Sequence, residues 1–506
     1  MSVHTPRESV RSAPSGRDAS HRPVLVVMML SLATVVSAVA SLNVAIPSIA
    51  RDTHASLTEL SWVVDAYALV FAALLLPGGA IGDRFGRRRT LLAGLAIFGL
   101  GSVAAMTRAD ATWLIGMRGV LGVGAALVMP ATLSTITSTF PAAERAKAVG
   151  TWAGVAGASA ILGLLTSGLV LEVWSWRAVF AVNVVLAVAA IAGTLRVVPE
   201  SADPSAPRLD LTGALISLAS LGVLVYSIIE APTRGWTDAR TLAGLAVALV
   251  GLVAFVAVEV RRHEPLLDPR LFTYRGFAAG TLTITVQFFA FFGFIFLLLQ
   301  YLQLVLADNP LTAALSLVPL AFGLMPTARV IAPKVSARIG TARTSVIGLV
   351  VAAAAFGWLS QLDAHSSYWP LLVGLVPLGA GMALAMTPAT AAITDALPRE
   401  KQGVGSAMND LARELGGALG IAVLGSVLQS AYRSNLDVGG LPGPAAEQAK
   451  SSLALAVRLG PDVAASAENA FVDGLHLALW IGAGVLIVAA AAVATLHRTA
   501  RDQAGG

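Results

Sequence analysis

Five charged residues that could handle protons lie inside long apolar segments, where a charge is costly and usually serves a function. They are Asp65, Arg118, Asp410, Arg413 and Glu414. Asp410 and Glu414 are four residues apart, so a helix places them on one face with Arg413 beside them. Burial favours a neutral carboxyl, whereas a nearby arginine favours a charged one. The triplet therefore predicts either a protonation switch or a fixed ion pair within one helix.

Other residue types that could do chemistry show no catalytic pattern. The chain has no cysteine, which excludes disulfides, thiolate metal sites and cysteine nucleophiles. Its seven histidines have no metal-ligand spacing, and the sequence contains no phosphate-binding Gly-x-x-x-x-Gly-Lys-Ser/Thr, no His-Glu-x-x-His and no Gly-x-Ser-x-Gly motif. We therefore expect no enzyme, no ATP-driven transport within this chain, no cofactor and no metal.

The composition is that of a protein embedded in a lipid bilayer. Hydrophobic residues make up 56% of the 506 residues and charged residues only 12%, about half the share of a soluble domain. No Asp, Glu, Lys or Arg occurs between Arg22 and Arg51, a stretch longer than the roughly 20 residues that cross a membrane as a helix. The net charge of +5 is explained by basic loops on one side of the membrane rather than by nucleic-acid binding.

Apolar windows between charged loops predict fourteen membrane-spanning helices. We expect them at about 24–48, 60–80, 90–107, 112–137, 148–171, 178–197, 211–230, 241–260, 277–306, 311–332, 344–361, 368–394, 403–431 and 474–496. Alternate loops hold most of the Lys and Arg residues, and this asymmetry places both termini in the cytoplasm. Residues 1–22 and 498–506 are expected to be cytoplasmic tails, the first of them disordered, and 432–473 an extracellular loop.

The sequence also resembles itself. The block from Gly122 to Thr132 is similar to that from Gly379 to Thr390, and two loops repeat with offsets of 254 to 257 residues. We therefore expect two six-helix bundles in the same orientation, residues 23–198 and 276–497, flanking a linker with two additional helices at 199–275. Parallel repeats of this kind enclose a site between them and expose it alternately to the two sides.

A loop after the second span is dense in glycine and arginine. Its key residues are Gly79, Gly82, Asp83, Arg84, Gly86, Arg87 and Arg88. Glycine allows a tight turn between packed helices, and Asp83 can pair with an arginine or a helix N-terminus as a breakable latch. The alternative is a loop that is basic only to orient the chain. The spacing resembles the signature of the major facilitator superfamily.

Further segments resemble the fourteen-span drug:proton antiporter branch of that superfamily. Arg118-Gly-Val-Leu-Gly122-Val-Gly124 is similar to the family's fourth-span motif, and segments beginning at Asn43, Trp62, Trp176, Gln300 and Asn409 match the branch. The resemblance implies an all-helical protein that exports lipophilic or amphipathic drugs or antibiotics in exchange for protons, close to exporters of actinobacteria. It also implies a bacterial plasma membrane, a monomer, and proton-handling roles for Asp65, Arg118 and the triplet at 410–414.

The chain departs from the branch at three positions. Ala38 and Ala391 stand where the branch usually has Asp, and Leu164 stands where its fifth-span motif is Gly-rich after a proline that is also absent. These departures leave a second interpretation open, an uncoupled facilitator or an exporter dedicated to one metabolite. The remaining motif glycines are expected to allow close helix packing: Gly122, Gly124, Gly154, Gly157, Gly163 and Gly168.

Substrate contacts are expected from aromatic and amide side chains. The ninth span is rich in phenylalanine and ends with two glutamines, a composition that suits lipophilic or cationic ligands. A helix that faces lipid would look similar, so each phenylalanine has this alternative. The candidate cavity residues are Asn43, Trp62, Tyr67, Phe288, Phe292, Gln300, Gln303 and Asn409.

Overall fold

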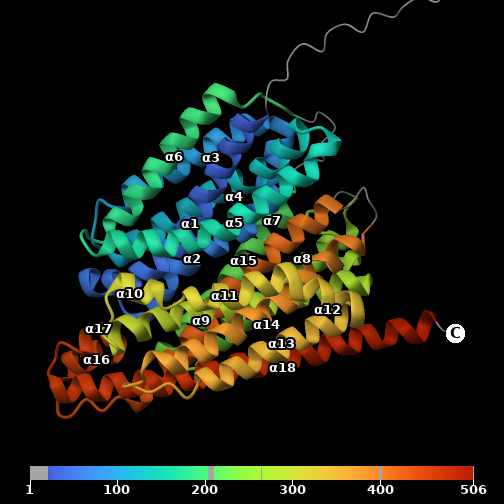
Figure 1. The fold of residues 1–506 in the computed structure, drawn as a ribbon. Coiled ribbons are helices and arrows are strands. Elements are labelled where there is room, and N and C mark those ends of the chain that lie inside the picture. The colour runs from blue at the N-terminus through green and yellow to red at the C-terminus, as the bar shows by residue number, and fades with distance from the viewer. Residues whose placement is uncertain (1–20, 203–209, 264, 398–401, 505–506) are drawn as a thin grey trace, which may run out of the picture.

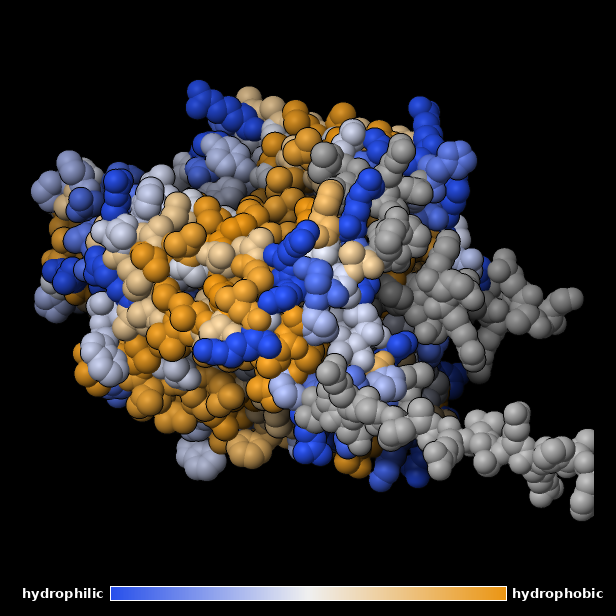
Figure 2. All heavy atoms as spheres, turned by 90° about the horizontal axis from the view of Figure 1, so that it is seen from above, coloured by the Kyte–Doolittle hydropathy of each residue, from blue (hydrophilic) through white to orange (hydrophobic). Residues whose placement is uncertain are grey.

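The computed structural model describes residues 21–202, 210–263, 265–397 and 402–504, and these residues form helices and contain no strand (Figure 1). Within these described ranges, fourteen helices are long and apolar enough to cross a membrane, which confirms the predicted number. Figure 2 shows a broad apolar belt between two ends where hydrophilic residues gather, as a bilayer requires. Most of the predicted tail at 1–22 lies outside the described residues.

The N-terminal half consists of six helices. They are α1 (Arg22–Thr53), α2 (Leu57–Phe85), α3 (Arg87–Ala105), α4 (Ala111–Thr139), α5 (Ala142–Leu171) and α6 (Arg177–Val197). Two further helices follow, α7 (Leu211–Arg234) and α8 (Ala239–Arg261).

The C-terminal half is more broken. It comprises the short helix η1 (Pro269–Thr273), α9 (Arg275–Gln300), the π turn η2 (Tyr301–Val305), α10 (Pro310–Leu315), α11 (Val318–Pro326), the π turn η3 (Thr327–Ile331), α12 (Ala332–Ile339), α13 (Thr341–Leu359), α14 (Tyr368–Asp395), α15 (Gln402–Asn435), α16 (Gly443–Ser451), α17 (Leu453–Ala456) and α18 (Pro461–Ala504). The tenth span is thus α10 to α12, interrupted near its prolines.

The two halves repeat one packing pattern. In the N-terminal half α1 packs on α5 and α6, α2 on α4, and α3 on α4 and α6; in the C-terminal half α9 packs on α15 and α18, α11 on α14, and α13 on α14 and α18. The loops match as well, because Gly86 and Gly340 both join two helices with a positive φ, at +113° and +90°. The internal repeat predicted from the sequence is therefore confirmed.

We call the end of the molecule that holds residues 54–56 and 306–309 the outer end, following the charge-based prediction, and the opposite end, with residues 83–89, the inner end. At the outer end α10 packs on α5, and α1 packs on α10 and α17. At the inner end no extensive packing joins α4 or α5 to α11, α12 or α14 among the described residues. The halves therefore converge at the outer end and part at the inner end.

The additional helices cover the side of the molecule where the halves meet. α7 packs on both α2 and α15, whereas α8 packs mainly on α7. The side chains of α8 are largely exposed, as expected of a helix that faces lipid.

The last helix begins earlier than expected. α18 starts at Pro461, inside the predicted loop 432–473, and continues to Ala504 through the predicted tail. The rest of that segment holds α16 and α17 at the outer end (Figure 1). Residues 461–473 are thus an outward extension of the spanning helix.

Four of the six motif glycines do allow close packing. An added Cβ at Gly122 would lie 2.7 Å from the Tyr67 carbonyl oxygen, at Gly124 2.8 Å from that of Gly94, and at Gly163 2.6 Å from that of Ser37; at Gly168 it would lie 3.0 Å from Leu311 Cα. The prediction of close helix packing was wrong for Gly154 and Gly157 in this conformation. No described atom lies within 4 Å of a Cβ added there, because the inner half of α5 faces the space where the halves part.

The two kinds of glycine give a matched test of packing. Gly122→Ala is expected to lower stability by about 1–3 kcal/mol, because the new methyl group forces α2 away from α4. Gly157→Ala is expected to be neutral or stabilising by up to about 1 kcal/mol, through helix propensity alone. Thermal unfolding of the purified variants in one detergent measures the difference, and equal melting temperatures would contradict the assignment of Gly122.

Candidate proton-coupling and substrate site

Arg118 of α4 is fixed against α2 in the middle of the N-terminal half. It is 1% exposed. Its Nε donates a hydrogen bond to the Val63 carbonyl oxygen at 2.9 Å, and its Cζ lies 4.3 Å from the centre of the Tyr67 ring. The absence of a side chain at Gly122 brings the two helices close enough for both contacts. A buried guanidinium thus lies on an aromatic face, with no ion pair among the described residues.

Asp65 lies on the same helix as Tyr67 and is fully buried. Neither of its carboxyl oxygens accepts a hydrogen bond from any described group. An ionised carboxylate in such a place has no compensation for its lost hydration. Asp65 therefore fits the role of a residue that is neutral in this conformation.

The three charged residues of α15, Asp410, Arg413 and Glu414, have different partners in the structure. Arg413 approaches Asp410 at 3.9 Å, one helical turn away, and its Cζ lies 4.7 Å from the centre of the Phe288 ring. Glu414 makes no ion pair with any described residue, although Arg413 and Tyr67 both lie within electrostatic reach of it. The predicted ion pair is therefore present between Asp410 and Arg413, and the protonation switch stays a prediction for Glu414.

These groups meet because α2 and α15 pack along each other. Tyr67 and Phe288 belong to one buried cluster that crosses between the halves, with Leu411 of α15 in it and Phe292 packed against it. The rings of Phe288 and Phe292 are 5.8 Å apart. We call Tyr67, Arg118, Phe288, Arg413 and Glu414 the central constellation, which combines aromatic faces with two cations and one unpaired acid.

Asn409 completes one side of this region. Its Oδ1 accepts a hydrogen bond of 3.1 Å from the Thr390 hydroxyl, which joins α15 to α14. Ala391, the position where the branch usually has Asp, follows directly on α14 and is half-buried. The structure thus brings together Tyr67, Phe288 and Phe292 of the predicted cavity residues, and Asn409 lies on α15 directly before Asp410.

The other predicted cavity residues were misplaced. Gln303 Nε2 donates to the Val44 carbonyl oxygen at 3.0 Å, so it joins the halves at the outer end. Gln300 is buried at the same end and donates to the Phe296 carbonyl oxygen. Trp62 packs on Tyr226 of α7 with ring centres 6.0 Å apart, and the Asn43 amide donates back to Val39 within α1.

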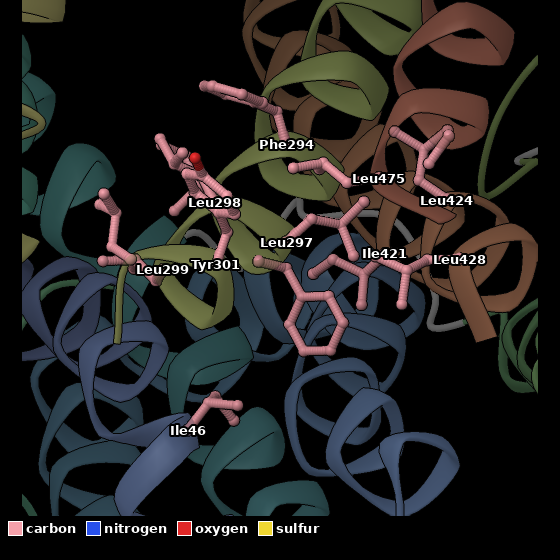
Figure 3. Packing of buried hydrophobic residues seen from close by; sticks show 14 of the residues in the cluster. Ile46, Phe294, Leu297, Leu298, Leu299, Tyr301, Ile421, Leu424, Leu428 and Leu475 are labelled. Carbon is pink, nitrogen blue, oxygen red and sulfur yellow. The ribbon is translucent and has the colours of Figure 1, made fainter. Parts of the chain in front are cut away.

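The outer end is closed by a seam that the sequence did not reveal. Arg51 donates to the Gln303 carbonyl oxygen at 3.3 Å, and Glu172 accepts a hydrogen bond of 3.2 Å from the Leu311 backbone. Figure 3 shows Ile46 of α1 beneath Leu299 and Tyr301, with leucines of α15 and α18 beside them. Arg51 and Glu172 lie at the ends of α1 and α5. A charge at the end of a span is expected in any membrane protein, so its position in the sequence does not indicate a contact between the halves.

The glycine- and arginine-rich loop at the inner end is held to its own half. Arg87 Nη2 pairs with Asp83 at 2.8 Å, which is one of the two pairings that the motif predicted. Arg88 donates from its side chain to the Leu195 carbonyl oxygen and from its backbone to Glu200. Among the described residues Asp83 makes no hydrogen bond or ion pair with the C-terminal half, so the latch does not join the halves here.

Glu200, which holds the inner loop, was not among the residues predicted from the sequence. It lies just after α6 and also accepts from the Ser201 backbone and pairs with Arg89 at 3.7 Å. The remaining residues of the loop fit their expected roles: Gly79 and Gly82 lie against Pro130 and Thr90, and Arg84 is exposed. No feature of the sequence near Glu200 links it to a loop more than a hundred residues away.

Comparison with known proteins agrees with this geometry. The Major Facilitator Superfamily matches residues 27–421. The tetracenomycin C resistance and export protein of Streptomyces glaucescens is 32% identical, over 99% of this chain and 95% of that protein. The multidrug efflux pump LfrA of Mycolicibacterium smegmatis is 34% identical, over 97% and 99%. The methyl viologen resistance protein SmvA of Salmonella typhimurium is 33% identical, over 90% and 92%.

Solved structures support the fold. A bacterial homologue of the human lysosomal transporter Spinster, in an inward-facing and unoccupied conformation, superimposes with a TM-score of 0.66 at 18% identity, over 96% of this chain and 98% of that one. A transporter of the POT family, PepTSo, gives 0.63 at 15% identity, over 95% and 98%. With its repeated halves, its motif loop and these relatives, this chain belongs to the major facilitator superfamily.

Proposed function

We propose that this protein is a secondary transporter that exports lipophilic or amphipathic small molecules, such as antibiotics or drugs, in exchange for protons. The observation that carries the proposal is the central constellation, where an unpaired acid and two cations meet aromatic faces between two halves that part at the inner end. The relatives named above for drug efflux and antibiotic export support the substrate class. Aromatic faces bind cationic and apolar ligands without a fixed shape.

In this proposal Glu414 is the group at which proton and substrate meet. Its carboxylate attracts a cationic substrate from the inner side, and a proton arriving from the outer side neutralises it and releases the substrate there. Exchange of one monocation for one proton moves no net charge, so the pH gradient drives it, and one pH unit supplies about 1.4 kcal/mol, enough for a concentration ratio of about ten. For a neutral substrate the same proton also gains about 2.3 kcal/mol per 100 mV of membrane potential.

The inner end faces the cytoplasm in this proposal, with both termini there and the protein in the bacterial plasma membrane. The charge asymmetry of the loops supports this orientation. The proton gradient is the only energy source required, and the transporter acts as a monomer. No cofactor or nucleic acid takes part.

Transport in proteoliposomes tests the proposal. Purified protein is reconstituted, a pH gradient is imposed, and movement of a fluorescent lipophilic cation is followed. We expect movement against its concentration gradient that stops when an uncoupler is added. Movement that is indifferent to uncouplers would contradict proton coupling and favour the uncoupled facilitator. The apolar packing around Ala38, where related antiporters usually have Asp, supports that second candidate.

A further inference from the structure

A cavity lies at the outer end, within the C-terminal half. Its volume is about 830 Å³, which suits a drug-sized ligand. The walls come from η2, from α10 and from the loop that leads into α14. This outer cavity is separate from the central constellation, since none of the five constellation residues lines it.

The backbone beside the cavity has an unusual shape. η2 is a π turn, and such turns are rare and occur frequently at functional sites. Ala307 follows it with φ +56°, one of two non-glycine residues with a positive φ among the described residues, a conformation that costs roughly 1 kcal/mol or more. The Asp308 amide donates to the Leu302 carbonyl oxygen at 2.9 Å and closes the turn. The chain is thus bent so that Asp308 lines the cavity.

Asp308 is a carboxylate without a partner. It is half-buried and forms no ion pair with any described residue. Burial raises the pKa of its carboxyl above the ordinary value. The neighbouring acid, Asp363, is already engaged by the His365 backbone and the Ser366 hydroxyl. His365 is exposed at the edge of the cavity.

The remaining walls are aromatic and apolar. The Tyr301 hydroxyl donates to the Asp363 carbonyl oxygen at 2.6 Å, and the Tyr368 hydroxyl to that of Ser316 at 3.3 Å. Tyr301 is fully buried within the wall, whereas Tyr368 is exposed and, with its hydroxyl group engaged, offers the cavity mainly its ring. Leu306 and Leu315 add accessible apolar surface to the lining. An unpaired carboxylate among aromatic and aliphatic walls fits a ligand with one positive charge and a greasy body.

We propose that the outer cavity is a binding site for lipophilic organic monocations, reached from the outer side while the outer seam is closed. The π turn η2 contributes to both the outer cavity and the outer seam: Tyr301 lines the cavity, whereas Gln303 donates a hydrogen bond to the N-terminal half. The site therefore exists in the conformation that closes the exit from the centre. It does not depend on the direction or the coupling of transport.

The absence of cysteine in the natural chain makes a direct test possible. Ser367→Cys places one thiol in the cavity lining, and its reaction with a membrane-impermeant maleimide is timed in nanodiscs that hold the full-length protein. We expect tetraphenylphosphonium to slow the reaction several-fold, with saturation. Ser175→Cys, exposed on the loop between α5 and α6, is the control and is expected to react at one rate throughout. Tetraphenylborate, of the same shape and opposite charge, is expected to give no protection.

Charge variants in the Ser367→Cys background assign the site. Asp308→Asn is expected to weaken protection by up to about fivefold, as for loss of a partly exposed ion pair, and Asp308→Glu to retain it. Asp462→Asn removes an exposed acid from the same end of the molecule, and Glu414→Gln removes the acid of the central constellation. Both variants are expected to leave protection of Ser367→Cys unchanged. Protection that survives Asp308→Asn, extends to Ser175→Cys, or disappears with Glu414→Gln would overturn the proposal.

Discussion

Replacing Glu414 by Gln is expected to reduce proton-driven efflux about tenfold or more and to weaken binding of a cationic substrate, while leaving binding of a neutral lipophilic substrate within a factor of a few. Glutamine keeps the size and hydrogen-bonding capacity of the side chain but can neither carry a charge nor exchange a proton. Glu414 is the acid of the α15 triplet that has no ion pair among the described residues. Its loss therefore removes the coupling step and not the aromatic walls that bind the substrate.

Proton release measures this effect without a membrane. Purified protein in weakly buffered detergent solution is mixed with a cationic substrate, and the pH change is recorded. If a substrate cation displaces a proton, the native protein acidifies the solution on binding, whereas Glu414→Gln does not. Binding measured in parallel by tryptophan fluorescence shows that the variant is folded.

Asp410→Asn is the matched control for Glu414→Gln. The Asp410 carboxyl lies 3.9 Å from Arg413, whereas Glu414 makes no ion pair with any described residue, and a nearby arginine favours the charged form of a carboxyl. We expect it to retain proton release and to lose at most a few-fold in rate. The opposite outcome, release lost with Asp410→Asn and kept with Glu414→Gln, would make Asp410 the proton carrier.

The sequence predicted the fold well because membrane physics leaves few choices. A chain in lipid must satisfy its backbone internally, so each apolar window becomes a helix. Repeats such as Gly86 and Gly340 report a backbone conformation directly, since both positions have a positive φ that glycine adopts without strain. The two halves could therefore be recognised without coordinates.

Depth along a helix was harder to predict. Gln300 and Gln303 were expected in the cavity with Phe288 because they share a span. α9 and η2 together are 31 residues long, or about 45 Å as a helix, so one end lies at the outer seam while the middle lies at the constellation. A glutamine at the end of a spanning helix and a glutamine that lines a cavity look the same in the sequence, and only their tertiary contacts distinguish them.

Partners across long separations were not predictable either. The outer seam joins Val44 to Gln303 and Glu172 to Leu311, and the inner loop depends on Glu200. Each of these bonds uses at least one backbone group, which has the same donors and acceptors in every residue. No pattern of side chains marks such a pairing in one sequence.

Arg118→Gln is expected to abolish transport while changing stability little. Removing a buried charge from an ion pair is strongly destabilising, because the partner is left uncompensated. Arg118 has no such partner among the described residues: it bonds to the Val63 carbonyl oxygen and lies on the Tyr67 ring. The bond is worth roughly 1.5–3 kcal/mol and the ring contact about 2 kcal/mol, and relief of the buried charge offsets several kcal/mol of this loss.

Transport depends on the charge itself. Arg118 and Glu414 both lie close to Tyr67, so Arg118 is the cation that the N-terminal half contributes to the central constellation. We expect Arg118→Gln to lose at least about nine-tenths of proton-driven efflux, and Arg118→Lys, which keeps the charge but not the guanidinium geometry, to retain part of it. Efflux rates and melting temperatures of both variants, measured on the same preparations, separate the two roles. A melting temperature that falls in step with transport, equally for Gln and Lys, would show that Arg118 acts as a strut between α2 and α4 rather than as a charge in the exchange cycle.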